Sequence, residues 1–322
     1  MLIHADARAI PLRDESVNCC VTSPPYWGLR DYGAAGQIGL EPTPELYVAT
    51  MVDVFREVRR VLKADGTLWL NIGDSYAATA SNNGGYSDKS TLAGFTRPDT
   101  KGRQACDSGE RRALRSGLKP KDLVGIPWRV AFALQADGWW LRSDIIWAKP
   151  NPMPESVTDR PTKAHEYLFL LAKSERYWYD ADAISEPWAD ERKGQPGSPS
   201  PKALTIPGQS PHTLGSAAWS SEGKQGRNAR SVWTIPTTPY PGAHFATFPP
   251  ELARRCILAG CPPGGIVLDP FVGSGTTVMV ARQLGREGIG LDINSKYLDE
   301  QAAQRIKTDR GFAFGKEQEA PS

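Results

Sequence analysis

The chain has 322 residues, of which 40% are hydrophobic, so it can bury the core of one large domain with an insertion or of two domains. No segment reaches the ~20 apolar residues of a membrane span, and the amino end lacks the features of a signal peptide, so we expect no membrane contact. The five cysteines form no CxxC pair, which argues against a disulfide framework and a zinc site; no metal is expected. A reducing, cytoplasmic setting agrees best with this composition.

Strands and helices are expected to alternate through the first part of the chain. Apolar residues at helical spacing predict a helix after Pro44, and Gly66 separates it from the next strand. The second strand must leave the sheet at Ser23, because the two prolines that follow have no N–H group for a central strand. The expected elements are a short buried strand over 2–6 that ends in a carboxylate, a strand over 16–22, a helix over 44–63 and a strand over 67–73.

Two irregular segments interrupt the middle of the chain. Residues 77–121 hold nine Lys or Arg against four Asp or Glu, and such a basic insertion either binds phosphates or is a solvated loop without a partner. In residues 194–231, eighteen of the thirty-eight positions are Gly, Pro or Ser, which is typical of a linker or of a binding loop. The regular elements between them are a helix over 125–136 and strands over 139–148 and 166–174.

The last third of the chain alternates helix and strand without an irregular segment. This alternation predicts a largely parallel, doubly wound α/β sheet. The expected elements are a helix over 250–260, a strand over 265–270, a tight turn over 272–277 that opens a helix to 284, a strand over 287–293 and an amphipathic helix over 295–308.

A glycine turn lies between a strand and a helix in this last part. Gly273 and Gly275 let the backbone approach a ligand closely, and the helix that follows points its free N–H groups at the same place. This arrangement suits a nucleotide-like ligand, whose ribose hydroxyls could donate to Asp292 at the end of the next strand. Asp269, just before the turn, would pair well with an ammonium group. The turn lacks the third glycine of a dinucleotide-binding G-x-G-x-x-G motif, and glycines that serve packing alone are the alternative.

A proline turn, Ser23-Pro24-Pro25-Tyr26-Trp27, follows the second strand. It should therefore lie at the carboxyl edge of the sheet, where ligands bind in open α/β folds. Proline rigidity fixes the turn and two aromatic rings follow it directly. Taken alone, this sequence is as expected for an ordinary Pro-Pro loop with surface aromatics.

The two turns together carry a resemblance. TSPPYWGLRDY near the amino end and DPFVGSGTT near the carboxyl end resemble the amino-methylating DNA methyltransferases, and more narrowly their β-class, whose circularly permuted order places the catalytic motif before the cofactor motif. HADARAIPL, GTLWLNIGD, WLRSDIIWAKPNPMPES, RPTKAHEYLFLLAKS and GAHFATFPPEL extend the similarity over most of the chain. The resemblance implies the Rossmann-like class I methyltransferase fold, S-adenosyl-L-methionine as cofactor, double-stranded DNA as substrate and base flipping.

The resemblance also implies the reaction. Serine at the first motif position resembles the enzymes that methylate N4 of cytosine, whereas N6-adenine enzymes mostly carry Asp there, and adenine stays the alternative. Ser23 Oγ and the Pro24 carbonyl would bind the target amine, with Pro25 fixing the turn. Tyr26 would stack on the flipped base, and Trp27 would line the pocket or pack beneath it. None of the five cysteines follows a proline, which excludes methylation at C5 of cytosine.

Further residues are assigned by the resemblance to the cofactor and to DNA. Asp6 would approach the cofactor's adenine, and Phe271 would shield the cofactor. The implied cofactor residues are Asp6, Thr247, Phe248, Asp269, Phe271, Gly273, Ser274, Gly275, Thr276 and Asp292, and the DNA contacts of the basic insertion are Arg111, Arg112 and Arg115.

The chain divides accordingly. The catalytic part is 1–76 and 122–179, the basic insertion 77–121, the target-recognition region 180–232, the cofactor-binding part 233–310 and a flexible tail 311–322. A homodimer and a cognate restriction endonuclease remain open as further partners. Two other functions compete with the methyltransferase. A nucleotide-dependent oxidoreductase would leave the proline turn unexplained, and a non-catalytic DNA-binding module would not need the glycine turn and its acids together.

Overall fold

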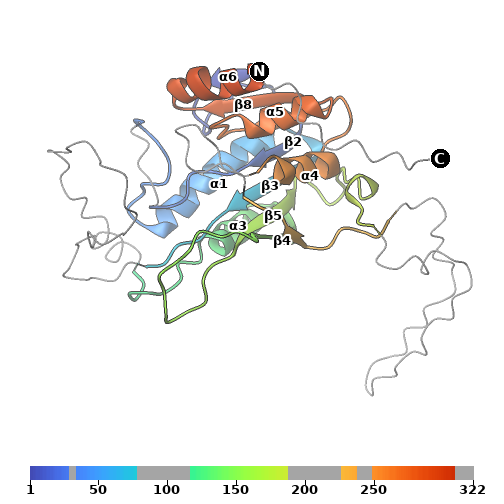
Figure 1. Ribbon diagram of the computed structural model, residues 1–322. Coiled ribbons are helices and arrows are strands. Elements are labelled where there is room, and N and C mark those ends of the chain that lie inside the picture. Colours follow the sequence, from blue (N-terminus) through green and yellow to red (C-terminus); the bar gives the residue numbers. More distant parts are fainter. Residues whose placement is uncertain (29–33, 78–116, 188–225, 238–248, 309–322) are drawn as a thin grey trace, which may run out of the picture.

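The computed structural model describes residues 1–28, 34–77, 117–187, 226–237 and 249–308. Within these residues the chain forms one eight-stranded sheet in the order β1-β8-β7-β2-β3-β5-β4-β6, which Figure 1 shows running from β8 at the top to β4 at the bottom. The strands are β1 (Leu2–His4), β2 (Val17–Thr22), β3 (Leu62–Ile72), β4 (Trp140–Ala148), β5 (His165–Ala172), β6 (Val232–Thr234), β7 (Ile266–Asp269) and β8 (Glu287–Asp292). Of the described strands only β5 runs antiparallel to its neighbours, so the mostly parallel sheet is confirmed.

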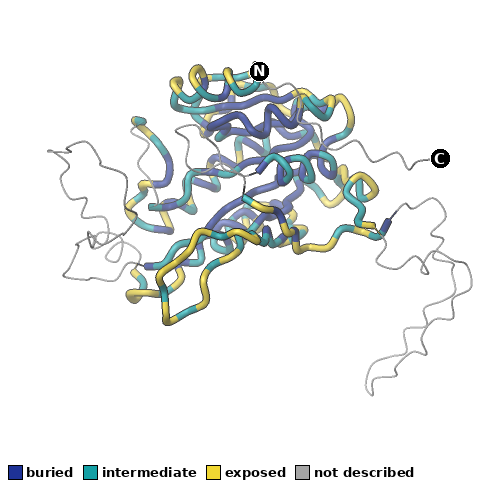
Figure 2. Tube along the Cα trace, viewed as in Figure 1, coloured by how far each residue is buried: buried dark blue, intermediate teal, exposed yellow. Residues whose placement is uncertain are grey.

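Helices cover both faces of the sheet, as the doubly wound fold requires. Along β2, Cys20 packs with α1 and α3, whereas Cys19 and Val21 pack with α4 and α5 on the other face. All six residues of β2 are buried, and Figure 2 shows the central strands as the buried interior of the molecule. The helical elements are α1 (Pro44–Val61), α3 (Ile126–Ala136), the 3-10 turn η1 (Asp182–Ile184), α4 (Pro250–Gly260), α5 (Thr276–Gln283), the π-helical segment η3 (Tyr297–Ala302) and α6 (Ala303–Thr308).

The long helix α1 begins and ends where its sequence directs. Thr43 caps it by accepting a hydrogen bond from the Leu46 amide at 3.3 Å, and Pro44 occupies the first turn, where its missing N–H costs nothing. Its apolar stripe, which includes Tyr47 and Phe55, is buried against the sheet. Leu46, in the first turn, faces solvent and is 50% exposed.

The predicted elements are present, with four differences. The strand expected over 67–73 is part of β3, which begins at Leu62 directly after α1, so Gly66 lies within the strand and does not separate it from the helix. The strand expected over 2–6 is not buried, because β1 is an edge strand that pairs only with β8. The three-residue strand β6, parallel to β4, was not predicted. The helix expected over 295–308 is divided between the π-helical segment η3 and α6.

The ends of the basic insertion are held together by the backbone. The Ala77 amide donates to the Asp122 carbonyl at 2.8 Å, and the Lys121 amide donates back to Ala77 at 3.0 Å. The chain thus leaves and re-enters the domain at one place. Residues 78–116, with Arg111, Arg112 and Arg115, lie outside the described residues.

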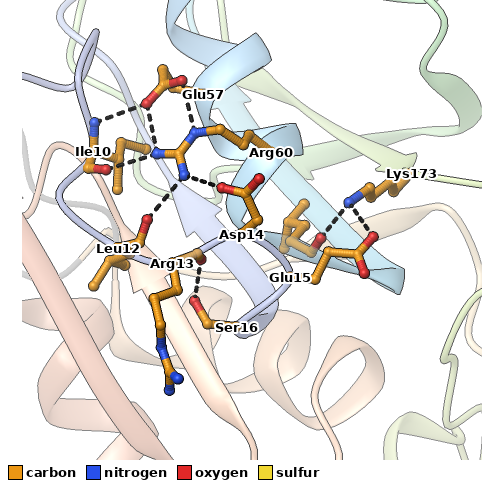
Figure 3. A network of polar contacts seen from close by, with 10 residues as sticks. Ile10, Leu12, Arg13, Asp14, Glu15, Ser16, Glu57, Arg60 and Lys173 are labelled. Atoms are coloured by element: carbon orange, nitrogen blue, oxygen red, sulfur yellow. Dashed lines mark hydrogen bonds and ion pairs between the residues drawn. The ribbon is translucent and has the colours of Figure 1, made fainter.

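Arg60, near the end of α1, binds the segment before β2 through hydrogen bonds and ion pairs (Figure 3). Arg60 donates to the carbonyls of Ile10 and Leu12 at 2.8 and 2.9 Å, and it forms ion pairs with Glu57 and Asp14. The far end of β2 carries the proline turn, so this contact holds the strand that positions the turn.

Two further properties of the described residues bear on function. None of their helices is long and apolar enough to cross a membrane. Their four cysteines are free and buried, and no group of His, Cys, Asp and Glu side chains within the described ranges is arranged to hold a metal ion.

Candidate active site

A single pocket joins the amino-terminal and carboxyl-terminal motifs. Residues of the proline turn line it together with residues of the glycine turn, and the segments around Gln37 and Asn294 complete its walls. The arrangement arises because β2 and β7 are neighbouring parallel strands, with Cys19 opposite Val267, so the turns that follow them leave the same edge of the sheet.

The proline turn is held in place from two sides. Thr22, the last residue of β2, donates its hydroxyl to Asp269 Oδ1 at 2.6 Å, and the Tyr47 hydroxyl of α1 donates to the Pro25 carbonyl at 2.9 Å. The four residues predicted to be catalytic, Ser23, Pro24, Pro25 and Tyr26, all line the pocket.

The two aromatic residues of the turn have different environments. The Tyr26 ring packs on the backbone of Gly73, where an added Cβ would lie 2.5 Å from a ring carbon, and its hydroxyl donates to Glu166 at 2.7 Å. Burial, together with the Glu166 charge, raises the pKa of Tyr26 well above its ordinary value. Trp27 is only 3% exposed, and its indole N–H donates to the Glu41 carbonyl at 3.0 Å. Of the two roles expected for Trp27, its burial supports packing beneath the pocket.

The glycine turn has the backbone shape that only glycine adopts easily. Gly273 and Gly275 have φ angles of +45° and +84°, and Gly275 precedes α5 as its cap. The Gly273 amide donates to Asp292 Oδ2 at 3.1 Å, which joins the turn to the end of β8. Gly275 lies outside the pocket lining; an added Cβ would meet the backbone of Ala302 at 3.2 Å. Glycine is therefore required at position 275 both by the positive φ and by this close packing.

Two carboxylates, the buried Asp269 and the half-buried Asp292, lie at the ends of β7 and β8. Asp269 is 2% exposed and accepts hydrogen bonds from Thr22, from Thr277 at 2.7 Å and from the Phe271 amide at 3.1 Å. Burial raises the pKa of Asp269 to about 6, and burial likewise raises the pKa of Asp292. Both carboxylates line the pocket, so a cation or hydroxyl donors of a ligand would relieve the cost of burying them.

Four other predicted cofactor residues also line the pocket: Phe271, and three residues whose side chains have polar partners. Asp6 pairs with Arg8 at 2.6 Å, and this contact lowers the pKa of Asp6. Ser274 and Thr276 each accept a hydrogen bond from Arg305 of α6 at 2.8 Å. Thr247 and Phe248 lie outside the described residues.

Sequence reasoning missed a group of polar residues beside Tyr26. Asn71 and Glu166 contact the Tyr26 hydroxyl, and Lys149 pairs with Glu166. The group gathers here because antiparallel β5 starts at the edge where β3 and β4 end, with Trp147 opposite Glu166. The only sequence signal was that these residues fall within the segments of family resemblance, without an assigned role.

The fold and the site define a class: a doubly wound α/β enzyme whose pocket lies between an amino-terminal proline turn and a carboxyl-terminal glycine turn, as expected for amino-methylating DNA methyltransferases. Residues 17–304 match the N6_N4_Mtase family, described as DNA methylase. The chain belongs to this family and is a DNA methyltransferase.

Relatives agree with this assignment. The chain is 48% identical over 298 residues to the type II methyltransferase M.SmaI of Serratia marcescens, covering 92% of this chain and 87% of that one. It is also 48% identical over 300 residues to the type II methyltransferase M.Cfr9I of Citrobacter freundii, covering 92% and 85%.

Solved structures share the fold. PvuII DNA methyltransferase (cytosine-N4-specific) superposes with a TM-score of 0.57 at 17% identity, over 95% of this chain and 89% of that one. A putative DNA modification methylase from Thermus thermophilus, complexed with S-adenosyl-L-methionine, gives a TM-score of 0.54 at 23% identity, over 95% and 92%. These likenesses confirm the class I methyltransferase fold.

Proposed function

We propose that the protein transfers a methyl group from S-adenosyl-L-methionine to the exocyclic N4 amine of cytosine at specific sites in double-stranded DNA. The observation that carries this proposal is the pocket in which Ser23 faces the same space as Asp269, Gly273 and Asp292. A methyl donor held by the glycine turn then lies within the cavity that the proline turn lines.

The pocket residues suit this cofactor. An ionised carboxylate has about four acceptor positions, and Asp269 uses three of them for Thr22, Thr277 and the Phe271 amide. The remaining position would bind the ammonium group of the cofactor's methionine part. Asp292 would accept from the ribose hydroxyls, Asp6 would approach the adenine, and Phe271 would cover the cofactor. When bound, S-adenosyl-L-methionine supplies a methyl group made electrophilic by its sulfonium charge.

The proline turn would hold the base. An exocyclic amine is a weak nucleophile because its lone pair is delocalised into the ring, so the site must orient it. Ser23 Oγ and the Pro24 carbonyl would accept its two N–H bonds, and Tyr26 would contact the ring after base flipping. Serine at position 23 favours cytosine over the alternative, adenine. The fold neighbour named cytosine-N4-specific is in agreement with this choice.

The partners follow from the same proposal. Residues 77–121, with Arg111, Arg112 and Arg115, would contact DNA phosphates, and residues 180–232 would read the bases. Because relatives that match over most of the chain are named type II methyltransferases, we extend the proposal to a site-specific role beside a cognate endonuclease. Light scattering of the purified protein tests whether a second copy of the chain is also a partner.

Nucleoside mass spectrometry tests the reaction. Amplified bacterial genomic DNA, which carries no methylated bases, is incubated with the protein and S-adenosyl-L-methionine and then digested to nucleosides. The expected product is N4-methylcytosine, and Ser23→Ala should abolish most of it while cofactor binding, measured by calorimetry, is retained. N6-methyladenine as the product would overturn the choice of base.

A further inference from the structure

A chain of hydrogen bonds leads from the reacting end of the pocket into the protein. Ser23 Oγ lies 3.5 Å from the Tyr26 hydroxyl, which lies 2.7 Å from Glu166 Oε2. The other oxygen of Glu166 pairs with the Lys149 ammonium, and Asn71 Nδ2 donates to Oε2 at 3.2 Å. These hydrogen bonds thus join Ser23 to the carboxylate of Glu166, which belongs to neither the proline turn nor the glycine turn.

The two ends of this chain have different surroundings. Ser23 and Tyr26 line the pocket, whereas Glu166 lies behind Tyr26, outside the pocket lining. The side chains of Glu166 and Lys149 are each 18% exposed, and the Lys149 ammonium also lies 4.3 Å from the centre of the Trp147 ring. Among the residues that the structure describes, Tyr26 is therefore the one through which Glu166 is placed to act on the pocket.

The charge of Glu166 fixes the direction of every hydrogen bond in the chain. An ionised carboxylate only accepts, so the Tyr26 hydroxyl must donate to it. The phenol oxygen is then left to accept, and the Ser23 hydroxyl donates its hydrogen toward Tyr26. Burial keeps the pKa of Tyr26 well above its ordinary value, so the phenol retains the proton that it donates. The Ser23 lone pairs are consequently free to face the pocket.

Resting on the proposed function, we propose that Glu166 is a positioning residue that acts through Tyr26 to orient the Ser23 hydroxyl as a hydrogen-bond acceptor toward the flipped base. A base that presents an amine donates a hydrogen bond to the Ser23 oxygen. A keto oxygen in the same place, as in uracil, has no hydrogen to donate and would face the lone pairs of the Ser23 oxygen. A site that requires such a donor discriminates strongly against the analogue that lacks it. Glu166 therefore contributes to selecting an amine as well as to holding it.

The bond changes leave Glu166 unaltered. The amine nitrogen forms one bond to the methyl carbon while the carbon–sulfur bond breaks, with its electron pair remaining on sulfur. The methylated nitrogen, which is then strongly acidic, releases one proton to water. Glu166 supports this step only by keeping the Ser23 oxygen directed at an N–H bond, so that the nitrogen lone pair faces the methyl group.

A double-mutant cycle tests the inference. Wild type, Glu166→Gln, Tyr26→Phe, the double variant and the control Glu175→Gln are compared in single-turnover methylation of amplified bacterial genomic DNA, with cofactor dissociation constants from calorimetry. Glu175 is exposed beyond the other end of β5 and offers the same chemical change away from the pocket. We expect Glu166→Gln to lower the single-turnover rate by about 10–100-fold, the loss of one oriented hydrogen bond, with little change in cofactor affinity.

The double variant carries the decisive comparison. If Glu166 acts through Tyr26, the double variant is no slower than Tyr26→Phe alone, because the second change removes a contact already lost. Rates that fall by the product of the two single losses would overturn the inference, as would a Glu166→Gln protein as fast as Glu175→Gln. A loss in Glu166→Gln matched by weaker cofactor binding would show a structural role instead.

Two outcomes separate this inference from the proposed function. N6-methyladenine as the wild-type product would contradict the proposed base and leave the cycle interpretable, since adenine also presents an amine. N4-methylcytosine from all five proteins at equal rates would contradict the inference alone. If the Glu166→Gln protein does not fold, the Tyr26→Phe protein, which lacks one hydroxyl, provides the test. A single-turnover rate of Tyr26→Phe equal to that of the wild type would overturn the proposal.

Discussion

Asp269 shows how one residue can serve both the fold and the ligand. Its carboxylate joins β2 to α5 through Thr22 and Thr277, yet it also lines the pocket. Burial without a charged partner raises its pKa to about 6, well above the ordinary value of about 3.9. Because the folded protein then holds this proton more tightly than the unfolded chain, Asp269 contributes less stability as the pH rises from about 4 to 6.

The raised pKa of Asp269 predicts a pH-dependent affinity for the cofactor. If the ionised carboxylate binds the cofactor's ammonium, the protonated form must first lose its proton, so binding weakens below pH 6. We expect the dissociation constant of S-adenosyl-L-methionine to be about tenfold higher at pH 5 than at pH 7. Calorimetry across this range measures it.

Isosteric variants provide the control for that measurement. Asp269→Asn should bind the cofactor more weakly at pH 7 and lose the dependence between pH 5 and 7, whereas Asp65→Asn, a change at an exposed carboxylate, should behave as wild type. A dependence that persists in Asp269→Asn would assign the titration to Asp292 instead, whose pKa burial also raises.

Single residues of the site were predictable where a local motif marked them. Ser23, Asp269 and Asp292 lie at the ends of predicted strands. In open α/β sheets ligands bind at the carboxyl ends of the strands, and this was enough to place the three residues together. Glu166 was not predictable, because its contact with Tyr26 spans 140 residues of sequence and depends on the direction of β5. Nothing in the local sequence around Glu166 encodes that neighbour.

At the scale of elements, the predictions were right where burial gives the apolar residues a clear helical or strand periodicity, and they failed where it does not. The strand β2 and the helix α1 carry long apolar patterns and were found within two residues of their expected limits. The three-residue strand β6 has one buried side chain, Trp233, which is too little for a pattern. Its pairing with β4 is a tertiary contact that propensity does not indicate.

The attachment of β2 to α1 leads to a prediction about stability. Arg60 donates to two backbone carbonyls and two carboxylates (Figure 3), and its side chain is 32% exposed. We expect Arg60→Ala to lower the free energy of unfolding by about 1–2 kcal/mol, since the carbonyls lose their donors but partly regain water. Urea denaturation measures the change.

The neighbouring arginine supplies the comparison. Arg13 is exposed, so Arg13→Ala should change the free energy of unfolding by less than about 0.5 kcal/mol. An Arg60→Ala protein as stable as Arg13→Ala would mean that the loop before β2 holds its conformation without Arg60.

The ends of the proposed recognition segment are fixed by contacts that suit an exchange experiment. Glu186 and Arg227 exchange two backbone hydrogen bonds, of 2.8 and 2.9 Å, and Glu186 also pairs with Arg230. Replacing residues 188–225 with the corresponding segment of a relative of different specificity therefore leaves the contacts of Glu186 with Arg227 and Arg230 in place. We expect altered modified sites, mapped by sequencing, with cofactor affinity unchanged. Unchanged sites would contradict the assignment of base reading to 180–232.

For the whole molecule, the permuted motif order is the property that the sequence predicts and the sheet explains. Thr22 and Asp269 are 247 residues apart, yet their side chains share a hydrogen bond of 2.6 Å because β2 lies beside β7. The alternation of strands and helices indicated a parallel sheet but not which strands are neighbours. Strand order is set by how the two helical layers pack, which depends on contacts across the whole chain.

This shared sheet predicts how the chain behaves when it is divided. A cut between residues 205 and 206 separates the strands β1 to β5 from β6, β7 and β8, and it leaves Ser23 on one fragment and Gly273 on the other. Both fragments contribute to the pocket, so neither should bind S-adenosyl-L-methionine alone.

Co-expressed, fragments 1–205 and 206–322 should assemble, because β7 fits between β2 and β8, and β8 pairs with β1. The complex should copurify through a tag on either fragment and bind the cofactor with an affinity within about tenfold of that of the intact chain. Cutting the chain removes the effective concentration that the covalent link gives the two parts, but it removes no contact with the cofactor. A matched cut between residues 50 and 51, inside α1, should give no binding, since it divides a buried helix. Cofactor binding by 206–322 alone at the affinity of the intact chain would mean that the amino-terminal strands do not complete the site.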